Sequence, residues 1–305
     1  GQGYYSLSDF LAQFADPNTG LTIFPTLLIP MGGRFEGMGT AYTAVAGDSG
    51  FLESNPSGSS LLESGELSFL HHSWIADSNI EGVIYTMRFN DLGFGVGGKF
   101  LYVPFTEYND WGEREARGYF SESVAILNLS YNFFSSFNFY GLAVGANLKA
   151  AYRSVPAAIY PDQSVLTGLL DLGLLTRFNF LKGYASRTKN FSVGLAMKNL
   201  GLPALSEPLP TTVTLGIAYS PLRPLIWALD FNLPVSFIPD EAPAERWYLA
   251  TGLNVTVASF LALQCGFQLK GDNPRVSVGS TIDLAKVSFV LNYNLDLSGR
   301  LNPLD

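Results

Sequence analysis

The feature that most limits how this chain can fold is strict alternation of apolar and polar side chains over segments of strand length. Residues 139–153 show it best, with one face formed by Tyr140, Leu142, Val144, Ala146, Leu148, Ala150 and Tyr152 and the other by Gly141, Ala143, Gly145, Asn147, Lys149 and Arg153. Successive side chains of a strand point to opposite sides, so the pattern predicts a β-strand with one apolar face. Tyrosines close this face at both ends, which is typical of a strand that crosses a bilayer.

The same alternation recurs after residue 65 in about thirteen segments, each near the roughly 9 to 11 residues that a tilted strand needs to cross a bilayer. Clear examples are residues 225–233, 247–257, 261–269 and 287–295. The sequence therefore predicts an all-β fold, an antiparallel transmembrane β-barrel of about 14 strands. No run of about 18 apolar residues occurs, so no helical membrane span is expected.

A soluble β-sandwich would also alternate, and composition decides between the two. Charged residues make up 14% of this chain, against about 25% in soluble proteins. The minor face of each segment carries mainly Gly, Ala, Ser and Asn, whereas a sandwich exposes many charges to solvent. Soluble strands also average only about 5 to 6 residues. Both observations favour the membrane barrel.

Charge and cysteine content exclude other classes. The net charge is −8 and no basic cluster occurs, so nucleic acid is not an expected partner. The single cysteine, Cys265, excludes an internal disulfide framework and a cysteine-based metal cluster. We expect no metal and no cofactor. The first residues lack the features of a signal peptide, which predicts a processed or cropped chain.

The N-terminal part has a different pattern. Residues 8–16 have helical spacing of apolar side chains after an N-cap signal, and residues 20–65 are rich in Gly, Pro and Ser without a clean period. We predict two parts, an N-terminal helix and plug over residues 1–64 inside the barrel, and the barrel itself over residues 65–305. Long and short links alternate between the strands, which predicts that the N-terminal part lies on the periplasmic side.

Two motifs lie just before the first predicted strand. Residues 34–49 contain Gly37-Met38-Gly39-Thr40-Ala41 and end in Asp48-Ser49, and Asn55-Pro56-Ser57-Gly58 follows. The stretch resembles the FadL-like superfamily of outer-membrane transporters for long-chain fatty acids and other hydrophobic compounds, whose members show "GMGGA…A…D" and then "NPAG". It is also similar to the related outer-membrane shuttle protein of type IX secretion. Ser57 replaces the usual Ala, and Gly47-Asp48 replaces two acids.

The resemblance implies a plug that fills the barrel from the periplasmic side. Irregular backbone at membrane depth is tolerated only inside a lumen, where wall groups or water satisfy it. On this basis the candidate plug or gating residues are Gly37, Gly39, Asn55 and Pro56, with a purely shape-giving role as the alternative. The implied function is passive uptake of a hydrophobic small molecule by a monomer in the bacterial outer membrane, in contact with its lipid. A non-transporting scaffold, a secretion shuttle and a general diffusion porin remain open.

Candidate ligand-binding residues are the apolar side chains of the N-terminal part, namely Phe10, Leu11, Phe14, Phe24, Leu27 and Leu28. The alternative is that they form the core of the plug. Charged residues expected inside the barrel are Lys99, Lys149, Arg153, Asp171, Arg177, Lys198 and Asp230. We expect internal pairing among them, with a carboxylate head group as the alternative partner for some cations.

An enzyme is the competitor from a different class. The run His71-His72-Ser73 offers a base and a nucleophile, but neighbouring strand residues face opposite sides, so His71 and His72 cannot both serve one site and Ser73 faces away from His72. A catalytic triad also needs a spatial geometry that sequence does not show. We therefore expect no catalysis.

The direction of the strands predicts a missing one. If the first strand runs outward, the segment 286–296 also runs outward, whereas single-chain bacterial barrels have even strand numbers. Residues 298–305 have the composition of an external loop. We therefore expect a closing strand beyond Asp305.

Overall fold

The computed structural model describes residues 23–73, 78–108, 111–112, 114–136, 139, 141–156, 163–205, 207–236, 247–270 and 273–296. Three of the candidate ligand-binding residues, Phe10, Leu11 and Phe14, lie outside the described residues, as do the expected helical segment 8–16 and the expected external loop 298–305.

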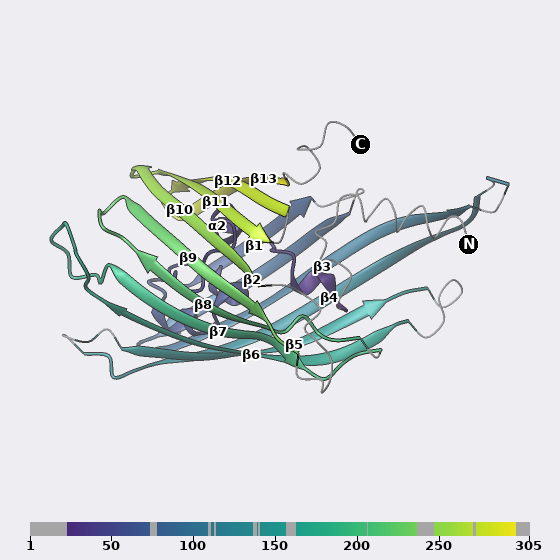
Figure 1. The fold of residues 1–305 in the computed structure, drawn as a ribbon, viewed down its shortest axis with the longest axis horizontal. Helices are drawn as coiled ribbons and strands as arrows, with labels where there is room; N and C mark the ends of the chain where they lie inside the picture. The colour runs from purple at the N-terminus through teal and green to yellow at the C-terminus, as the bar shows by residue number, and fades with distance from the viewer. Residues whose placement is uncertain are drawn as a thin grey trace.

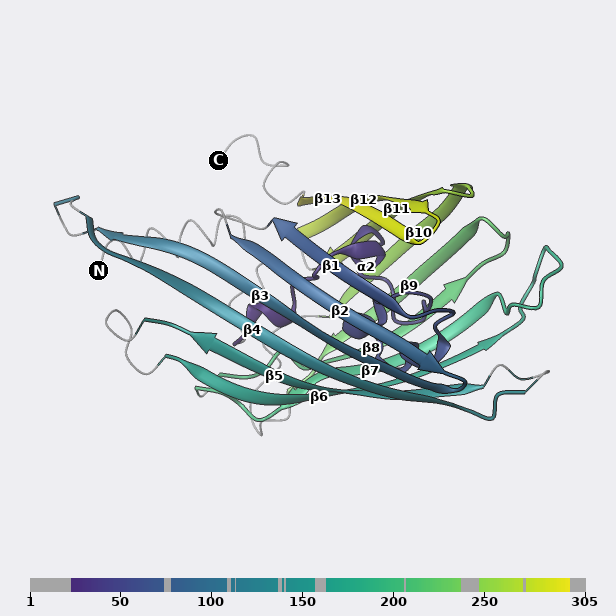
Figure 2. The ribbon, with the colours of Figure 1, turned by 180° about the vertical axis from the view of Figure 1, so that it is seen from behind.

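Thirteen strands form one antiparallel sheet in which each strand pairs with its neighbours in the sequence. The strands are β1 Glu66–Ser73, β2 Asn79–Phe89, β3 Leu92–Tyr108, β4 Arg114–Phe133, β5 Leu142–Ser154, β6 Val165–Phe178, β7 Phe191–Gly201, β8 Thr212–Tyr219, β9 Leu225–Pro234, β10 Tyr248–Ala258, β11 Leu261–Lys270, β12 Asn273–Leu284 and β13 Val287–Asp296. The sheet curves strongly, so that its two ends approach each other (Figures 1 and 2). The predicted all-β antiparallel class is confirmed.

The sheet is not closed. β1 and β13 stand at the two ends of the strand order and do not pair with each other within the described parts of the chain. The thirteen strands agree with the count of about thirteen alternating segments, and the two free edges agree with the expectation that one strand of about 14 is lacking from these residues; a closed barrel is not formed by the described residues. Two strand edges are joined only by a continuous ladder of backbone hydrogen bonds. The described residues of β1 and β13 form no such ladder with each other.

The apolar face of the sheet points outward and its polar face points inward, which is the reverse of the arrangement in a soluble protein. In β5 the residues Ala143, Asn147 and Lys149 are buried, whereas Leu148 is 62% exposed. Other large apolar side chains on the outward face include Leu67, Phe69, Leu127, Leu129, Leu166, Leu215, Leu263 and Leu291. The predicted alternation is confirmed, and its apolar side points away from the interior. A soluble sandwich would place that side in a core.

The N-terminal segment, residues 23–62, lies on the inner, concave face of the sheet (Figures 1 and 2). It contains four short elements, η1 Pro25–Leu27, α2 Gly33–Gly37, α3 Phe51–Ser54 and η2 Pro56–Leu61. α2 contacts β11, β12 and β13, while η2 contacts β2 to β6. One apolar cluster joins Phe24, Met31 and Phe51 of the segment to strand residues such as Ile84 and Val124. Among the described residues, no helix is long and apolar enough to cross a membrane.

Candidate functional site

Glycines of the inner face provide the surface on which the N-terminal segment packs. A Cβ atom added to each of the six glycines named next would overlap backbone or side-chain atoms of the segment. The pairs are Gly93 with Ser59, Gly145 with Pro56, Gly173 with Asn55, Gly194 with Thr43, Gly252 with Met38 and Gly266 with Gly39. The small side chains of the minor face thus allow backbone to approach backbone.

Asn55 is bound from three sides. Its Nδ2 donates to the carbonyl oxygens of Thr43 (2.8 Å) and Leu174 (2.9 Å), and its Oδ1 accepts from the backbone N–H (3.2 Å) and hydroxyl (2.7 Å) of Ser57. The Ser57 bond caps η2. The next carbonyl, that of Pro56, accepts from Asn128 Nδ2 at 2.8 Å. Asn55 therefore fixes the turn and ties it to β6 at once.

Gly37 and Gly39 lie elsewhere on the wall. Gly39 has a positive φ of 62°, and its backbone packs on Gly266 and Phe267 of β11. Gly37 packs beside Asn292 of β13 and Gln264 of β11. The four residues singled out in the motifs are therefore not one constellation, since two contact the β11–β13 end of the sheet and two contact β5 and β6. A gating role for them remains a prediction.

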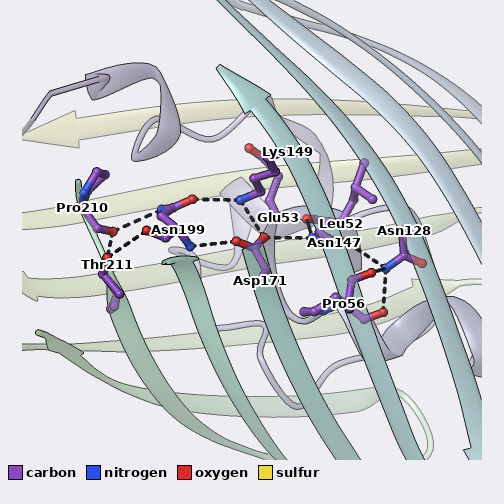
Figure 3. A network of polar contacts seen from close by, with 12 residues as sticks. Leu52, Glu53, Pro56, Asn128, Asn147, Lys149, Asp171, Asn199, Pro210 and Thr211 are labelled. Atoms are coloured by element: carbon purple, nitrogen blue, oxygen red, sulfur yellow. Dashed lines mark hydrogen bonds and ion pairs between the residues drawn. The ribbon is translucent and has the colours of Figure 1, made fainter. Parts of the chain in front are cut away.

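A network of buried polar side chains links the wall to the segment (Figure 3). Lys149 Nζ lies 2.6 Å from Asp171 Oδ2, and Asp171 also accepts from Asn147 Nδ2 (2.9 Å) and from the backbone N–H of Asn199 (2.7 Å). Asn147 in turn donates to the carbonyl of Leu52 at 3.0 Å. Buried charges need oppositely charged partners and hydrogen bonds to offset their lost hydration. This network therefore stabilises the packing of the N-terminal segment on the wall only while all members of the network are present.

Two further ion pairs line the interior. Lys99 Nζ lies 2.9 Å from Glu53 Oε1 of the segment, and Arg153 Nη2 lies 2.8 Å from Glu122 Oε1. The expectation of internal pairing is confirmed for Lys99, Lys149 and Arg153. Sequence reasoning missed both acids: Glu53 lies outside the alternating segments, and Glu122 was not recognised as a residue of the inner face.

Asp48, the acid of the first motif, has three partners within the segment, one of them the backbone N–H of Gly50, which donates to its Oδ1 at 2.9 Å. Its Oδ2 lies 2.7 Å from Arg34 Nε and accepts from the hydroxyl of Tyr42 at 2.8 Å. The carboxylate raises the pKa of the Arg34 guanidinium, and burial together with Asp48 raises the pKa of the Tyr42 phenol. The motif therefore encodes an ion pair and a neutral phenol that hold the turn together.

Glu36 of α2 reaches both free edges of the sheet. Its Oε1 lies 2.9 Å from His72 Nδ1 of β1, and its carboxylate accepts from Asn292 (3.3 Å) and Asn294 of β13. Side chains of the N-terminal segment thus bridge the two strands that lack a common backbone ladder.

The concavity between the segment and the wall holds a cavity of about 1760 Å³. Its apolar lining includes Leu27, Leu28 and Ile29 of the segment, together with Ile84, Val124 and Ile126 of β2 and β4. Phe24 is buried in the apolar core, under the guanidinium of Arg153 at 5.4 Å. Ligand binding by Leu27 and Leu28 remains a prediction.

Three lysines of the wall strands, Lys99, Lys149 and Lys198, line the same cavity, as does Lys286 of the β12–β13 turn. The first two have the acidic partners described above. Lys198, half-buried on β7, makes no hydrogen bond or ion pair to any residue that the structure describes. It is therefore the lysine of this set that can accept an outside anion.

The histidine pair does not form one site. His71 is exposed on the outward side, with Nδ1 2.7 Å from Glu81 Oε1 and Nε2 3.2 Å from Ser73 Oγ, whereas His72 points inward to Glu36. Over the described ranges, no cluster of three metal-ligating side chains occurs.

Comparison with solved structures identifies the class of fold. A crystal structure of the toluene transporter TodX of Pseudomonas putida superposes with a TM-score of 0.59, covering 87% of this chain and 92% of that one at 14% identity. A TodX mutant named as a monoaromatic hydrocarbon channel superposes with the same TM-score, at 13% identity over 86% of this chain and 92% of that one. The fold is that of these barrel proteins, which belong to the FadL family.

The family model described as "Uncharacterised protein family (UPF0164)" matches residues 12–303, so the chain belongs to this family. A UPF0164 protein of Treponema pallidum (strain Nichols) is 29% identical over 274 residues, which is 84% of this chain and 62% of the relative. Another from the same organism is 32% identical over 179 residues, which is 56% of this chain and 51% of the relative. The chain thus spans about half to three fifths of the length of these two relatives.

Proposed function

We propose that this protein is an outer-membrane transporter for passive uptake of hydrophobic small molecules. The observation that carries the proposal is the cavity between the N-terminal segment and the inner wall, which combines an apolar lining with polar walls inside a sheet whose outward face is apolar. Binding sites for small apolar ligands are concavities of this kind. The fold shared with TodX, a toluene transporter, supports the same class of cargo.

In this proposal the N-terminal segment acts as the plug and lies on the periplasmic side. Its packing on wall glycines and its hydrogen bonds to β4, β5 and β6 support a role as the part that divides the lumen. Polar wall groups satisfy its irregular backbone, which is the condition for such backbone at membrane depth.

Direct binding tests the proposal. We expect the purified protein in detergent to bind radiolabelled toluene or a radiolabelled long-chain fatty acid in equilibrium dialysis. The double substitution Leu27→Gln and Leu28→Gln should weaken binding by about ten-fold or more, because each leucine contributes more than 1 kcal/mol, roughly, when covered by an apolar ligand. Leu202→Gln is the control, since Leu202 is 81% exposed outside the cavity. Absence of binding to both probes, or equal effects of the cavity and control substitutions, would contradict the proposal.

Lys198 provides a test of the head group. Lys198→Met is expected to lower affinity for a long-chain carboxylate by about ten-fold, because a charge-assisted bond contributes roughly 1.5 to 3 kcal/mol. The methyl ester of the same acid should bind both proteins equally. An equal loss for acid and ester would show that Lys198 only shapes the cavity.

A further inference from the structure

Two connections at one end of the sheet are bound together into a single platform, defined as residues 179–190 between β6 and β7 and residues 220–224 between β8 and β9. The backbone N–H of Gly183 donates to the Pro221 carbonyl (3.2 Å), and that of Ser220 donates to the Asn190 carbonyl (2.8 Å). Arg223 donates to the carbonyl of Ala185. These bonds cross between the two connections, so the platform has a defined shape.

The platform is basic. It carries Lys182, Arg187, Lys189 and Arg223 and contains no Asp or Glu, in a chain whose net charge is −8. Lys182 Nζ and Arg223 Cζ lie 5.1 Å and 5.8 Å from the centre of the Tyr184 ring. Cation–π contacts with the Tyr184 ring therefore keep the Lys182 and Arg223 cations close to each other on the platform.

Exposed apolar side chains border these cations on the outward side. Phe180 is 48% exposed, Leu181 76% and Leu222 54%. Phe180 packs on Phe191 with ring centres 5.5 Å apart, and Phe191 lies 4.9 Å from Phe178 and 5.9 Å from Tyr219, so the apolar border continues into the outward faces of β6, β7 and β8. Aromatic and apolar groups followed by cations reproduce the order of a bilayer from its hydrocarbon edge to its phosphates.

We propose that this platform binds the phosphate groups of anionic lipids in the adjacent leaflet. The proposal goes beyond transport and rests only on the membrane placement of the proposed function. Cations near such a surface gain attraction to anionic lipid, and the gain falls as salt screens it. An acidic protein is the other class of partner, but it would not need an apolar border continuous with the outward face of three strands.

The test compares lipids on the purified protein in detergent micelles. Spin-labelled phosphatidylglycerol and spin-labelled phosphatidylcholine are added separately, and the motionally restricted fraction of each is measured. We expect the protein to prefer phosphatidylglycerol by about five-fold or more, the effect of roughly one cation at an anionic surface. The preference should fall toward unity in 1 M salt and in the variant Lys182→Gln, Arg187→Gln, Lys189→Gln and Arg223→Gln.

Two further variants keep the result interpretable. Arg187→Gln alone removes an exposed cation that makes no side-chain hydrogen bond or ion pair to any described residue, and should lower the preference without altering heat-modifiable migration in gels. Lys286→Gln, in the β12–β13 turn, should leave the preference unchanged. A preference that survives in the quadruple variant, or binding of an acidic protein with no lipid preference, would overturn the proposal. Failure of the protein to restrict either lipid would instead contradict the membrane placement itself.

Discussion

Replacing Gly173 with valine is expected to displace the N-terminal segment and to lower the free energy of unfolding strongly. A Cβ atom at this position would collide with the Asn55 side chain and the Pro56 ring. β6 cannot move away, because it is paired with β5 on one side and β7 on the other. Overpacking a fitted site costs about 1 to 3 kcal/mol, and loss of the Asn55 bonds adds about 1 kcal/mol each. The measurement is thermal unfolding followed by circular dichroism, with trypsin cleavage in residues 23–62 as a second readout.

Gly168→Val is the matched control in the same strand, because the nearest atom to a Cβ there is 4.0 Å away. It should change neither the unfolding midpoint nor the trypsin pattern by a comparable amount. If both valine variants lose equal stability, the loss arises from placing valine in β6 and not from disrupting the contact between β6 and the N-terminal segment.

Lys149→Met is the second substitution with a large expected effect. It leaves the carboxylate of Asp171, which is 1% exposed, without its cation. Removing one partner of a buried ion pair costs about 3 to 5 kcal/mol, because the remaining charge stays desolvated. Arg187→Met, an exposed cation, should change stability by no more than about 0.5 kcal/mol. Denaturant unfolding in detergent measures both.

The double variant Lys149→Met and Asp171→Leu completes a thermodynamic cycle. Removing both charges should recover part of the loss, since an apolar pair of similar volume can replace a buried ion pair. The bonds from Asn147 and Asn199 to Asp171 are lost as well, so recovery is expected to be incomplete. Strict additivity of the two single changes would show that Lys149 and Asp171 are not energetically coupled.

The residues of the candidate site were predictable to different degrees. Lys149 and Asp171 could be placed on the inner face from alternation, and their pairing follows from the cost of a lone charge at membrane depth. Their shared partner Asn199 could not, because β6 and β7 shift register between Leu170 and Leu172. Sequence also could not separate Lys198 from the paired lysines, since pairing depends on which acid lies across the lumen.

The contacts between the two ends of the sheet also could not be predicted from the local sequence pattern. Counting strands predicted thirteen strands with one lacking, and the described residues form thirteen strands with two free edges, but it did not predict that Glu36 bridges these edges through His72 and Asn294. Nothing in the local pattern around Glu36 indicates this contact, because it joins residues more than 250 positions apart.

By itself the sequence determined the class of fold and the number and facing of the strands, and it predicted a separate N-terminal part over residues 1–64. Those properties depend on local periodicity, because side-chain direction alternates along every strand whatever it pairs with. Only the tertiary structure decided which glycines contact the N-terminal segment, which acids neutralise the inner lysines and which lysine of the wall strands has no side-chain partner among the described residues. Those contacts depend on register and curvature, which bring distant strands together and which a one-residue shift would rearrange completely.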